Sequence, residues 1–232
     1  MIAYLCTFPI RKMKSYILSI ETATDSCSVA LHKAKRLVAS SISHIPKSHS
    51  SQLTTLIRQT LSKANIMLGD LGAIAVSIGP GSYTGTRIGV SMANGLAYGC
   101  KAYHPSLALI PINTLQIIAA KASKKILKNG YVLPLIDARR ERAYTLLTQG
   151  KNKPHTTILS VNIANLPIQP NDKDPLYIAG SGADQYINLL AHPYIKHIPN
   201  IKPEATTMGE IAYEALVDKK NKYSTYLKAL YI

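Results

Sequence analysis

Cysteine, acidic residues and long apolar runs are all scarce in this chain of 232 residues. The three cysteines, Cys6, Cys27 and Cys100, form no Cys-x-x-Cys pair and are odd in number, so we expect a protein of the reducing cytoplasm. No apolar run approaches the roughly 18 residues that a membrane-spanning helix needs. The composition therefore predicts a soluble, globular protein without a membrane contact.

Asp and Glu number only 12 against 27 Lys and Arg, and the formal net charge is +15. Such a chain favours polyanionic partners, RNA above all, because binding releases the counterions that surround phosphate groups. General solubility or a basic proteome is the alternative explanation. The basic clusters at 121–128, 139–142 and 219–222 are not interleaved with aromatic side chains, as a base-stacking surface would be.

The first ten residues are apolar, but they do not have the pattern of a signal peptide. The basic residues Arg11, Lys12 and Lys14 follow the apolar stretch, whereas a signal peptide carries its positive charges in front. Met13 stands directly before the first expected strand. We therefore expect residues 1–12 to be an extension outside the fold.

The stretch 73–99 is rich in glycine but lacks the common nucleotide-binding and hydrolase motifs. An apolar strand expected at 73–78 runs into Gly-Pro-Gly, and a helix is expected over 84–99. The glycine at the start of that helix is followed by Thr-Arg, where a P-loop has Lys-Ser/Thr. The spacing also differs from G-x-G-x-x-G and from G-x-S-x-G.

Glycine inside a helix costs about 1 kcal/mol relative to alanine, so Gly89 and Gly95 indicate close approach of another backbone. At about 100° per residue, apolar side chains fall on the same face as the glycines. This face is predicted to pack either on the protein's own sheet or on a partner. The face comprises Gly85, Ile88, Gly89, Met92, Gly95, Leu96 and Gly99, and the other side carries Arg87, Asn94 and Tyr98.

Strand and helix patterns predict the same β-β-β-α-β-α unit twice, which is the α/β, actin-like (ribonuclease-H-like) fold. We expect an N-terminal subdomain at 13–110 and a C-terminal subdomain with a short tail at 111–232. The first unit has strands at 16–20, 26–31, 37–43 and 73–78, with helices at 51–65 and 84–99. The second has strands at 131–136, 143–148, 156–161 and 176–179, with helices at 183–190 and 206–218.

The turns after the first strand of each unit lack the glycines that bring backbone amides to phosphates in nucleotide-binding proteins of this architecture. Glu21 and Thr22 begin the first turn, Asp137 begins the second, and Gly180 and Gly182 lie at a later strand-to-helix junction. We interpret these five residues as a vestigial nucleotide site, with ordinary turn and capping residues as the alternative. No catalytic residue, metal site or cofactor is predicted.

Several segments resemble the TsaB (YeaZ) family. They are ILSIETAT at 17–24, CSVAL at 27–31, AIAVSIGPGSYTGTRIGVSMANGLAYG at 73–99, LIDARRERAY at 135–144 and YLK at 226–228. The likeness spans about residues 14–228, and the glycine-rich segment is its most diagnostic part. The chain departs from the family in having Glu21 where Asp is usual and in its short tail after Leu227.

The resemblance implies a non-catalytic subunit, and not an enzyme, of the bacterial tRNA threonylcarbamoyladenosine (t6A) machinery. Such subunits pair with TsaD, which transfers threonylcarbamoyl to N6 of adenosine 37 in tRNAs that read ANN codons. The ATPase TsaE joins the pair, tRNA is reached through the complex, and a homodimer is expected when the subunit is alone. The implied partner interface lies on the two N-terminal helices, at Leu53, Ile57, Leu61, Gly85, Ile88, Gly89, Met92, Gly95 and Leu96.

Two other functions stay open at this point. A small-molecule kinase or ATPase of the actin-like class would use Glu21 or Asp137 as its metal or base carboxylate. A direct tRNA-binding module rests on the net charge alone.

Overall fold

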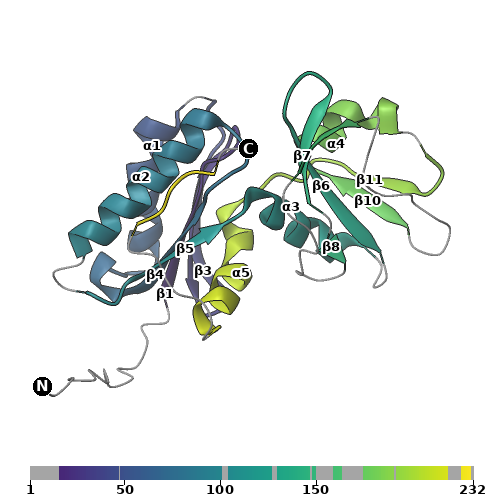
Figure 1. Ribbon diagram of the computed structural model, residues 1–232. Helices are drawn as coiled ribbons and strands as arrows, with labels where there is room; N and C mark the ends of the chain where they lie inside the picture. The colour runs from purple at the N-terminus through teal and green to yellow at the C-terminus, as the bar shows by residue number, and fades with distance from the viewer. Residues whose placement is uncertain are drawn as a thin grey trace, which may run out of the picture.

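The computed structural model describes residues 16–46, 48–100, 104–126, 130–146, 148–149, 159–163, 175–190, 192–218 and 226–230. These residues form two α/β lobes, each built around its own sheet (Figure 1). The predicted extension at 1–12 lies outside the described residues, as does the start of the strand expected at 156–161.

The first lobe is built on a five-stranded sheet with the order β3-β2-β1-β4-β5. Its first three strands form an antiparallel meander, and the other two run parallel to the first. The strands are β1 (Tyr16–Glu21), β2 (Cys27–Lys33), β3 (Arg36–Ser43), β4 (Leu71–Ser77) and β5 (Ala108–Ile112). Two helices, α1 (His49–Lys63) and α2 (Tyr83–Cys100), cover one face of this sheet (Figure 1), and a 3-10 turn at Leu68–Asp70 precedes β4.

The second lobe repeats this arrangement around β6 (Tyr131–Asp137). β6, β7 (Arg142–Thr145) and β9 (Leu159–Asn162) are antiparallel, and β10 (Leu176–Ala179) and β11 (Ile195–Ile198) run parallel to β6. β8 (Thr148–Gln149) pairs with the start of β6, and α4 (Ser181–Tyr186) continues into a 3-10 turn at Ile187–Leu190. Both sheets thus have the strand order 3-2-1-4-5 of actin-like proteins, which confirms the predicted fold class and its duplication.

The last helix of each lobe packs against the sheet of the other lobe. α3 (Thr114–Ala122) follows β5, yet its Leu115 and Ile118 share a buried core with Ile136 of the second sheet. α5 (Ala205–Val217) follows β11, yet it covers the face of the first sheet opposite to α1 and α2 (Figure 1). Because the two helices are exchanged, neither sheet is covered by its own half of the chain alone.

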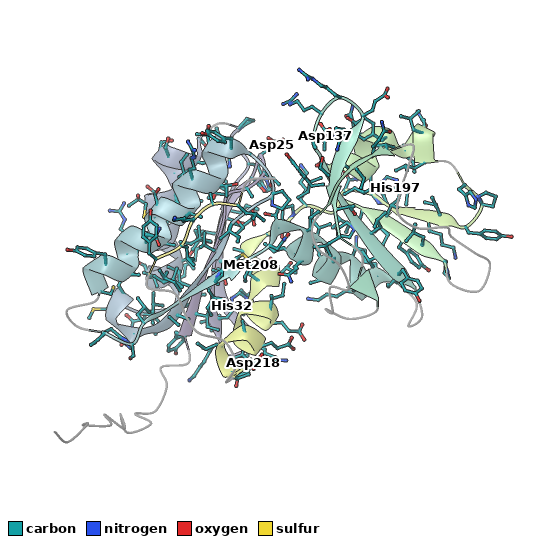
Figure 2. All side chains as sticks on the ribbon, viewed as in Figure 1. Asp25, His32, Asp137, His197, Met208 and Asp218 are labelled. Atoms are coloured by element: carbon teal, nitrogen blue, oxygen red, sulfur yellow. The ribbon has the colours of Figure 1, made fainter. Side chains whose placement is uncertain are left out.

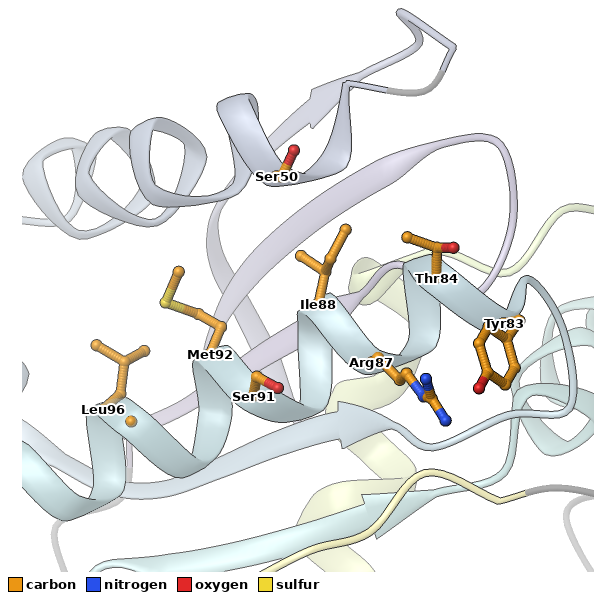
Figure 3. A pocket seen from close by; sticks show the side chains of 9 residues that line it. Ser50, Tyr83, Thr84, Arg87, Ile88, Ser91, Met92 and Leu96 are labelled. Carbon is orange, nitrogen blue, oxygen red and sulfur yellow. The ribbon is translucent and has the colours of Figure 1, made fainter.

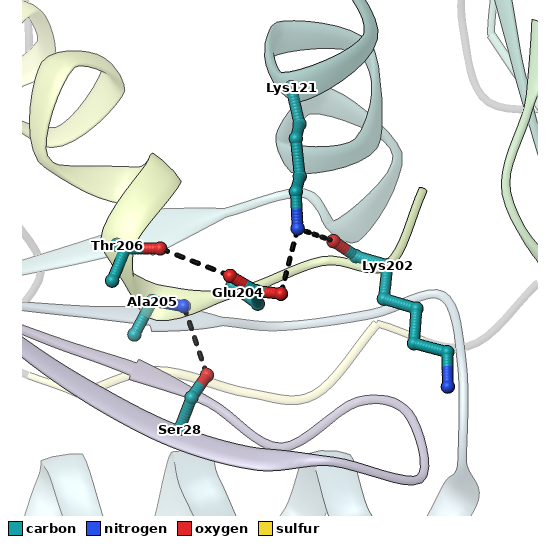
Figure 4. A network of polar contacts seen from close by, with 6 residues as sticks. All are labelled: Ser28, Lys121, Lys202, Glu204, Ala205 and Thr206. Carbon is teal, nitrogen blue, oxygen red and sulfur yellow. Dashed lines mark hydrogen bonds and ion pairs between the residues drawn. The ribbon is translucent and has the colours of Figure 1, made fainter. Parts of the chain in front are cut away.

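Polar contacts fix the place where the exchanged helices meet (Figure 4). Lys121 of α3 donates from Nζ to Glu204 Oε1 at 2.7 Å and to the carbonyl of Lys202 at 3.2 Å. The backbone N–H of Ala205 donates to Ser28 Oγ of β2 at 3.0 Å, which ties the start of α5 to the first sheet. The expected division at residue 110 stays a prediction, and residues 205–217 lie on the sheet of the N-terminal half.

The structure contains elements that the sequence analysis did not predict. β5, α3 and β11 were all missed, so each unit has a fifth strand after the expected order ends, and the first unit also has a further helix. The helix expected at 183–190 is shorter, because α4 ends at Tyr186 and continues as a 3-10 turn. In the part of the chain that the structure describes, no helix combines the length and the apolar character that crossing a membrane requires.

Candidate functional site

The Gly-Pro-Gly turn before α2 is held by three other segments. The N–H of Ser82 donates to the Ala23 carbonyl at 2.7 Å, and the N–H of Thr114 donates to the Gly79 carbonyl at 2.9 Å. The C-terminal segment adds a third contact, from the N–H of Leu230 to the Ile78 carbonyl at 2.7 Å. Gly79 has φ +108°, a conformation that residues with a Cβ rarely adopt. The turn therefore fixes the position and direction in which α2 begins.

The first two glycines of α2 face the protein's own β1–β2 turn. A Cβ at Gly85 would overlap the carbonyl oxygen of Thr22, and a Cβ at Gly89 would overlap Thr22 Oγ1. These glycines let the helix backbone lie directly on the turn after β1. Of the two explanations offered for the glycine face, packing on the protein's own sheet applies at these two positions.

Gly95 has different surroundings, because nothing lies within 4 Å of a Cβ built there. It lies on the open side of α2, in a groove of about 630 Å³ that α2 forms with the start of α1. Ile88, Met92 and Leu96 follow one another along the helix in this groove, with Ser50 of α1 opposite (Figure 3). All three apolar side chains pack partly on the core below and are partly open above. The groove is therefore an apolar surface with one open side.

The structure divides the nine predicted interface residues into two sets. Leu53, Ile57 and Leu61 of α1 are 0%, 5% and 7% exposed and lie in the core of this chain, and Gly85 and Gly89 are buried against the β1–β2 turn. These five residues support the helices from inside and have little or no surface to offer a partner. The set that lines the groove is Ile88, Met92, Gly95 and Leu96. Whether a partner binds there stays a prediction.

Five groove residues were missed or misplaced by the sequence analysis. They are Ser50, Tyr83, Thr84, Arg87 and Ser91. Arg87 was assigned to the opposite side of α2, but its guanidinium lies 3.7 Å from the centroid of the Tyr83 ring. The helical period centred on Gly95 would have found Thr84 and Ser91. The predicted face was centred on all four glycines of the helix, but Gly85 and Gly89 face the β1–β2 turn and only Gly95 and Gly99 are open.

The other flank of α2 is covered by the C-terminal segment, residues 226–230. Asn94 donates from Nδ2 to the Leu227 carbonyl and accepts the Leu227 N–H at Oδ1, both at 2.9 Å. The Leu227 side chain is 5% exposed and belongs to the core beneath α2. The groove therefore lies on a different flank of α2 from the one that the C-terminal segment covers.

The two residues of the supposed nucleotide site in the first turn, Glu21 and Thr22, are closed to solvent. Glu21 is fully buried at the end of β1, and its Oε1 accepts the Ala23 N–H at 2.6 Å. Burial raises the pKa of this carboxyl to about 7, although hydrogen bonds from Ala23 and Ser77 oppose the shift. The pKa of the neighbouring Cys27 thiol rises to about 11, mainly through burial and in part through Glu21. This carboxyl acts inside the protein as a partner of the turn backbone.

The second turn is also organised by local contacts. Asp137 Oδ1 accepts from the Arg139 N–H and from the Tyr186 hydroxyl, each at 2.8 Å. A Cβ at Gly180 would come within 2.5 Å of the Leu135 carbonyl oxygen, and one at Gly182 within 3.2 Å of the Asp137 nitrogen. Both glycines thus allow α4 to lie close to β6, which favours the turn-residue explanation over an adenosine contact. Among the described residues, no group of three or more His, Cys, Asp or Glu is placed to hold a metal ion.

Comparison with known proteins identifies the family of the chain. Residues 38–166 match the family model described as "TsaD: tRNA N6-adenosine threonylcarbamoyltransferase". The protein named tRNA threonylcarbamoyladenosine biosynthesis protein TsaB of Bacillus subtilis (strain 168) is 34% identical over 136 residues, which cover 59% of this chain and 56% of that protein. The TsaB protein of Escherichia coli (strain K12) is 38% identical over 130 residues, which cover 55% and 52%.

A solved structure, YeaZ from Pseudomonas aeruginosa, matches over 94% of this chain and 100% of its own, with a TM-score of 0.81 and 25% identity. Fold and matches together define a two-lobed α/β protein of the actin-like class. The chain belongs to the family of the matching model, and within it to the TsaB (YeaZ) proteins. It spans little more than half the length of the curated relatives that it matches.

Proposed function

We propose that this chain is a non-catalytic subunit of t6A biosynthesis in the cytoplasm, and that it binds a TsaD chain through the groove on α2. The observation that carries the proposal is the row of half-buried apolar side chains, Ile88, Met92 and Leu96, beside the open Gly95. The names of the TsaB relatives support the pathway.

Two physical features favour binding at the groove: its apolar surface is open to water, and Gly95 has no side chain. A partner helix that covers it removes apolar surface from water, which contributes about 25 cal/mol for each Å² buried. Gly95 carries no side chain on this surface, so the backbone of the partner can approach closely. The ATPase TsaE joins this pair, tRNA reaches it through the complex, and a second copy of the chain takes the place of TsaD when that subunit is absent.

A small-molecule kinase or ATPase is the second candidate, and the two turns give it little support. Glu21 is sealed from solvent, and Gly180 and Gly182 are explained by packing on β6. A kinase should be stabilised by Mg-ATP through ligand linkage, so its melting temperature should rise with ligand concentration. We expect no such rise for this chain.

The experiment mixes the purified chain with TsaD and measures the mass of the complex by light-scattering chromatography. Met92→Arg should abolish the complex, because the charge would be buried in an apolar contact. Gly95→Gln should do the same by filling the groove, and its Cβ meets no atom within 4 Å in the free chain. Tyr98→Arg is the matched control, since Tyr98 is 82% exposed on α2 and does not line the groove.

Circular dichroism and the melting temperature establish that each variant is folded before it is mixed. A complex that persists with folded Met92→Arg and Gly95→Gln, or that Tyr98→Arg weakens equally, would contradict docking at this groove. Failure of the wild-type chain to bind TsaD, even with TsaE, tRNA and ATP present, would contradict the subunit role itself.

A further inference from the structure

The turn between β6 and β7 has an unusual backbone. Arg139, Arg140 and Glu141 all lie in the left-handed region, with φ of 65°, 53° and 56°. This conformation is unfavourable for a residue with a Cβ, and runs of it are rare. Such strain persists only where the surroundings impose it, and it is concentrated at functional positions.

Contacts from three other elements hold this turn in place. Asp137 at the end of β6 accepts the Arg139 N–H and is itself bound by Tyr186 of α4. The Glu141 carbonyl accepts the N–H of Ile163, directly after β9, at 2.9 Å. The N–H of Arg142, the first residue of β7, closes the turn onto the Arg139 carbonyl at 3.1 Å. The tip is therefore a fixed platform.

The platform displays two arginines to solvent. Arg139 and Arg140 are exposed, and neither takes part in the ion pairs found among the described residues. The third arginine of the turn differs, because Arg142 donates to the carbonyl of Ser160 at 2.8 Å and to its Oγ at 3.2 Å. Two acidic groups lie beside the pair. Glu141 is exposed, and Asp137 is half-buried and already accepts two hydrogen bonds at its Oδ1. The guanidinium groups of Arg139 and Arg140 thus remain available to an external anion.

We propose that this turn binds the phosphate backbone of a structured RNA, without reading its bases. Guanidinium groups suit phosphate oxygens because they form paired, charge-assisted hydrogen bonds. A free nucleotide needs a concave site that buries its base, whereas Arg139 and Arg140 are exposed on the turn that follows Asp137, which is labelled in Figure 2. The net charge of +15 attracts RNA to the whole chain, and the two arginines provide a specific place on it for the phosphates.

The test measures the affinity of the isolated chain for fluorescently labelled tRNA by anisotropy, at several salt concentrations between 50 and 200 mM. The choice of tRNA as the probe rests on the proposed function. Arg139→Gln with Arg140→Gln should weaken binding about tenfold or more and lower the slope of log K against log salt by roughly 1.5 to 2. Arg139→Lys with Arg140→Lys should retain most of the affinity, because it keeps the charge.

The matched control is Lys124→Gln with Lys125→Gln. Both lysines are exposed and follow α3, and the two substitutions remove the same charge from the same lobe. This control should change affinity less than threefold. Equal loss in both double variants would overturn the proposal, because net charge alone would then explain binding. Competition by AMP at the same phosphate concentration, or no binding by the wild-type chain, would overturn it as well. The TsaD complex should have the same mass with the glutamine variant as with wild type, so failure here is distinguishable from failure of the docking proposal.

Discussion

Glu21 shows how strongly the environment of one residue departs from what its type predicts. It ends β1 as a carboxylic acid with no exposed surface, and burial raises its pKa from 4.5 to about 7. The folded state therefore holds a proton at pH values at which the unfolded chain has already lost it. Stability from this group is fully present below pH 4.5 and is lost as the pH rises through 7.

We expect wild type to lose about 3 kcal/mol relative to Glu21→Gln between pH 4.5 and 7.5, since the variant does not titrate at this position. Urea unfolding at pH steps across that window measures the difference. His32, which is buried and whose pKa is lowered by burial, is common to both proteins and cancels. Glu141→Gln, which removes an exposed carboxyl from the corresponding turn of the second lobe, is the control and should follow wild type. Parallel curves for wild type and Glu21→Gln would refute the shift.

The sequence marked the position of Glu21 but could not reveal its burial. The turn composition showed that the phosphate-binding glycines are missing, and the structure agrees in giving these residues turn contacts. The groups that close over this end of the first sheet are distant in sequence. Thr114 follows β5, and Ala205, which binds Ser28, comes 184 positions after Glu21. A local pattern carries no information about such partners.

At the scale of elements, α2 uses glycine in two ways that a stability measurement can separate. Gly85→Ala places a methyl group on the Thr22 carbonyl, and a backbone atom cannot move aside cheaply. We expect it to destabilise the chain by about 1–3 kcal/mol, as overpacking does. Gly95→Ala meets no atom within 4 Å, so it should stabilise the helix by about 0.5–1 kcal/mol.

The midpoint of urea unfolding, with the slope held constant, measures both variants under one condition. The opposite signs are the essential result. If both substitutions stabilised the chain, the close approach of α2 to the β1–β2 turn would be wrong. If both destabilised it, Gly95 would have a neighbour that the described residues do not show.

Two of the missed elements, β5 and α3, have separate physical reasons. β5 has the sequence ALIPI, and proline within a run argues against a strand unless the strand lies at an edge, which is where β5 lies. α3 is buried nearly all round, because one side packs under the second sheet and another faces the first-lobe core, so it has no polar face to give a helical period. β1 and β4 lie inside the first sheet and were predicted well, because their apolar runs are continuous.

At the scale of the whole molecule, the exchanged helices decide how the chain folds. The face of the first sheet that carries Ile17, Ala30 and Ile110 is covered by Met208 and Ala212 of α5, and Leu227 completes the core on the opposite face. All three covering residues come from the last 25 residues of the chain. The N-terminal half therefore contains a complete sheet but not a complete core.

We expect a fragment of residues 13–112, which contains all five strands of the first sheet, to lack a cooperative unfolding transition, because both faces of the sheet would expose apolar side chains that the full chain buries. The full chain should unfold in one transition, since α3 and α5 make each lobe depend on the other. Calorimetry and far-ultraviolet circular dichroism of the two proteins provide the comparison. A peptide of residues 200–232, added in excess, should restore protection of the fragment from protease. A fragment that melts cooperatively without the peptide would show that the N-terminal half is an independent domain, and that α5 only adds to a core that is already sufficient.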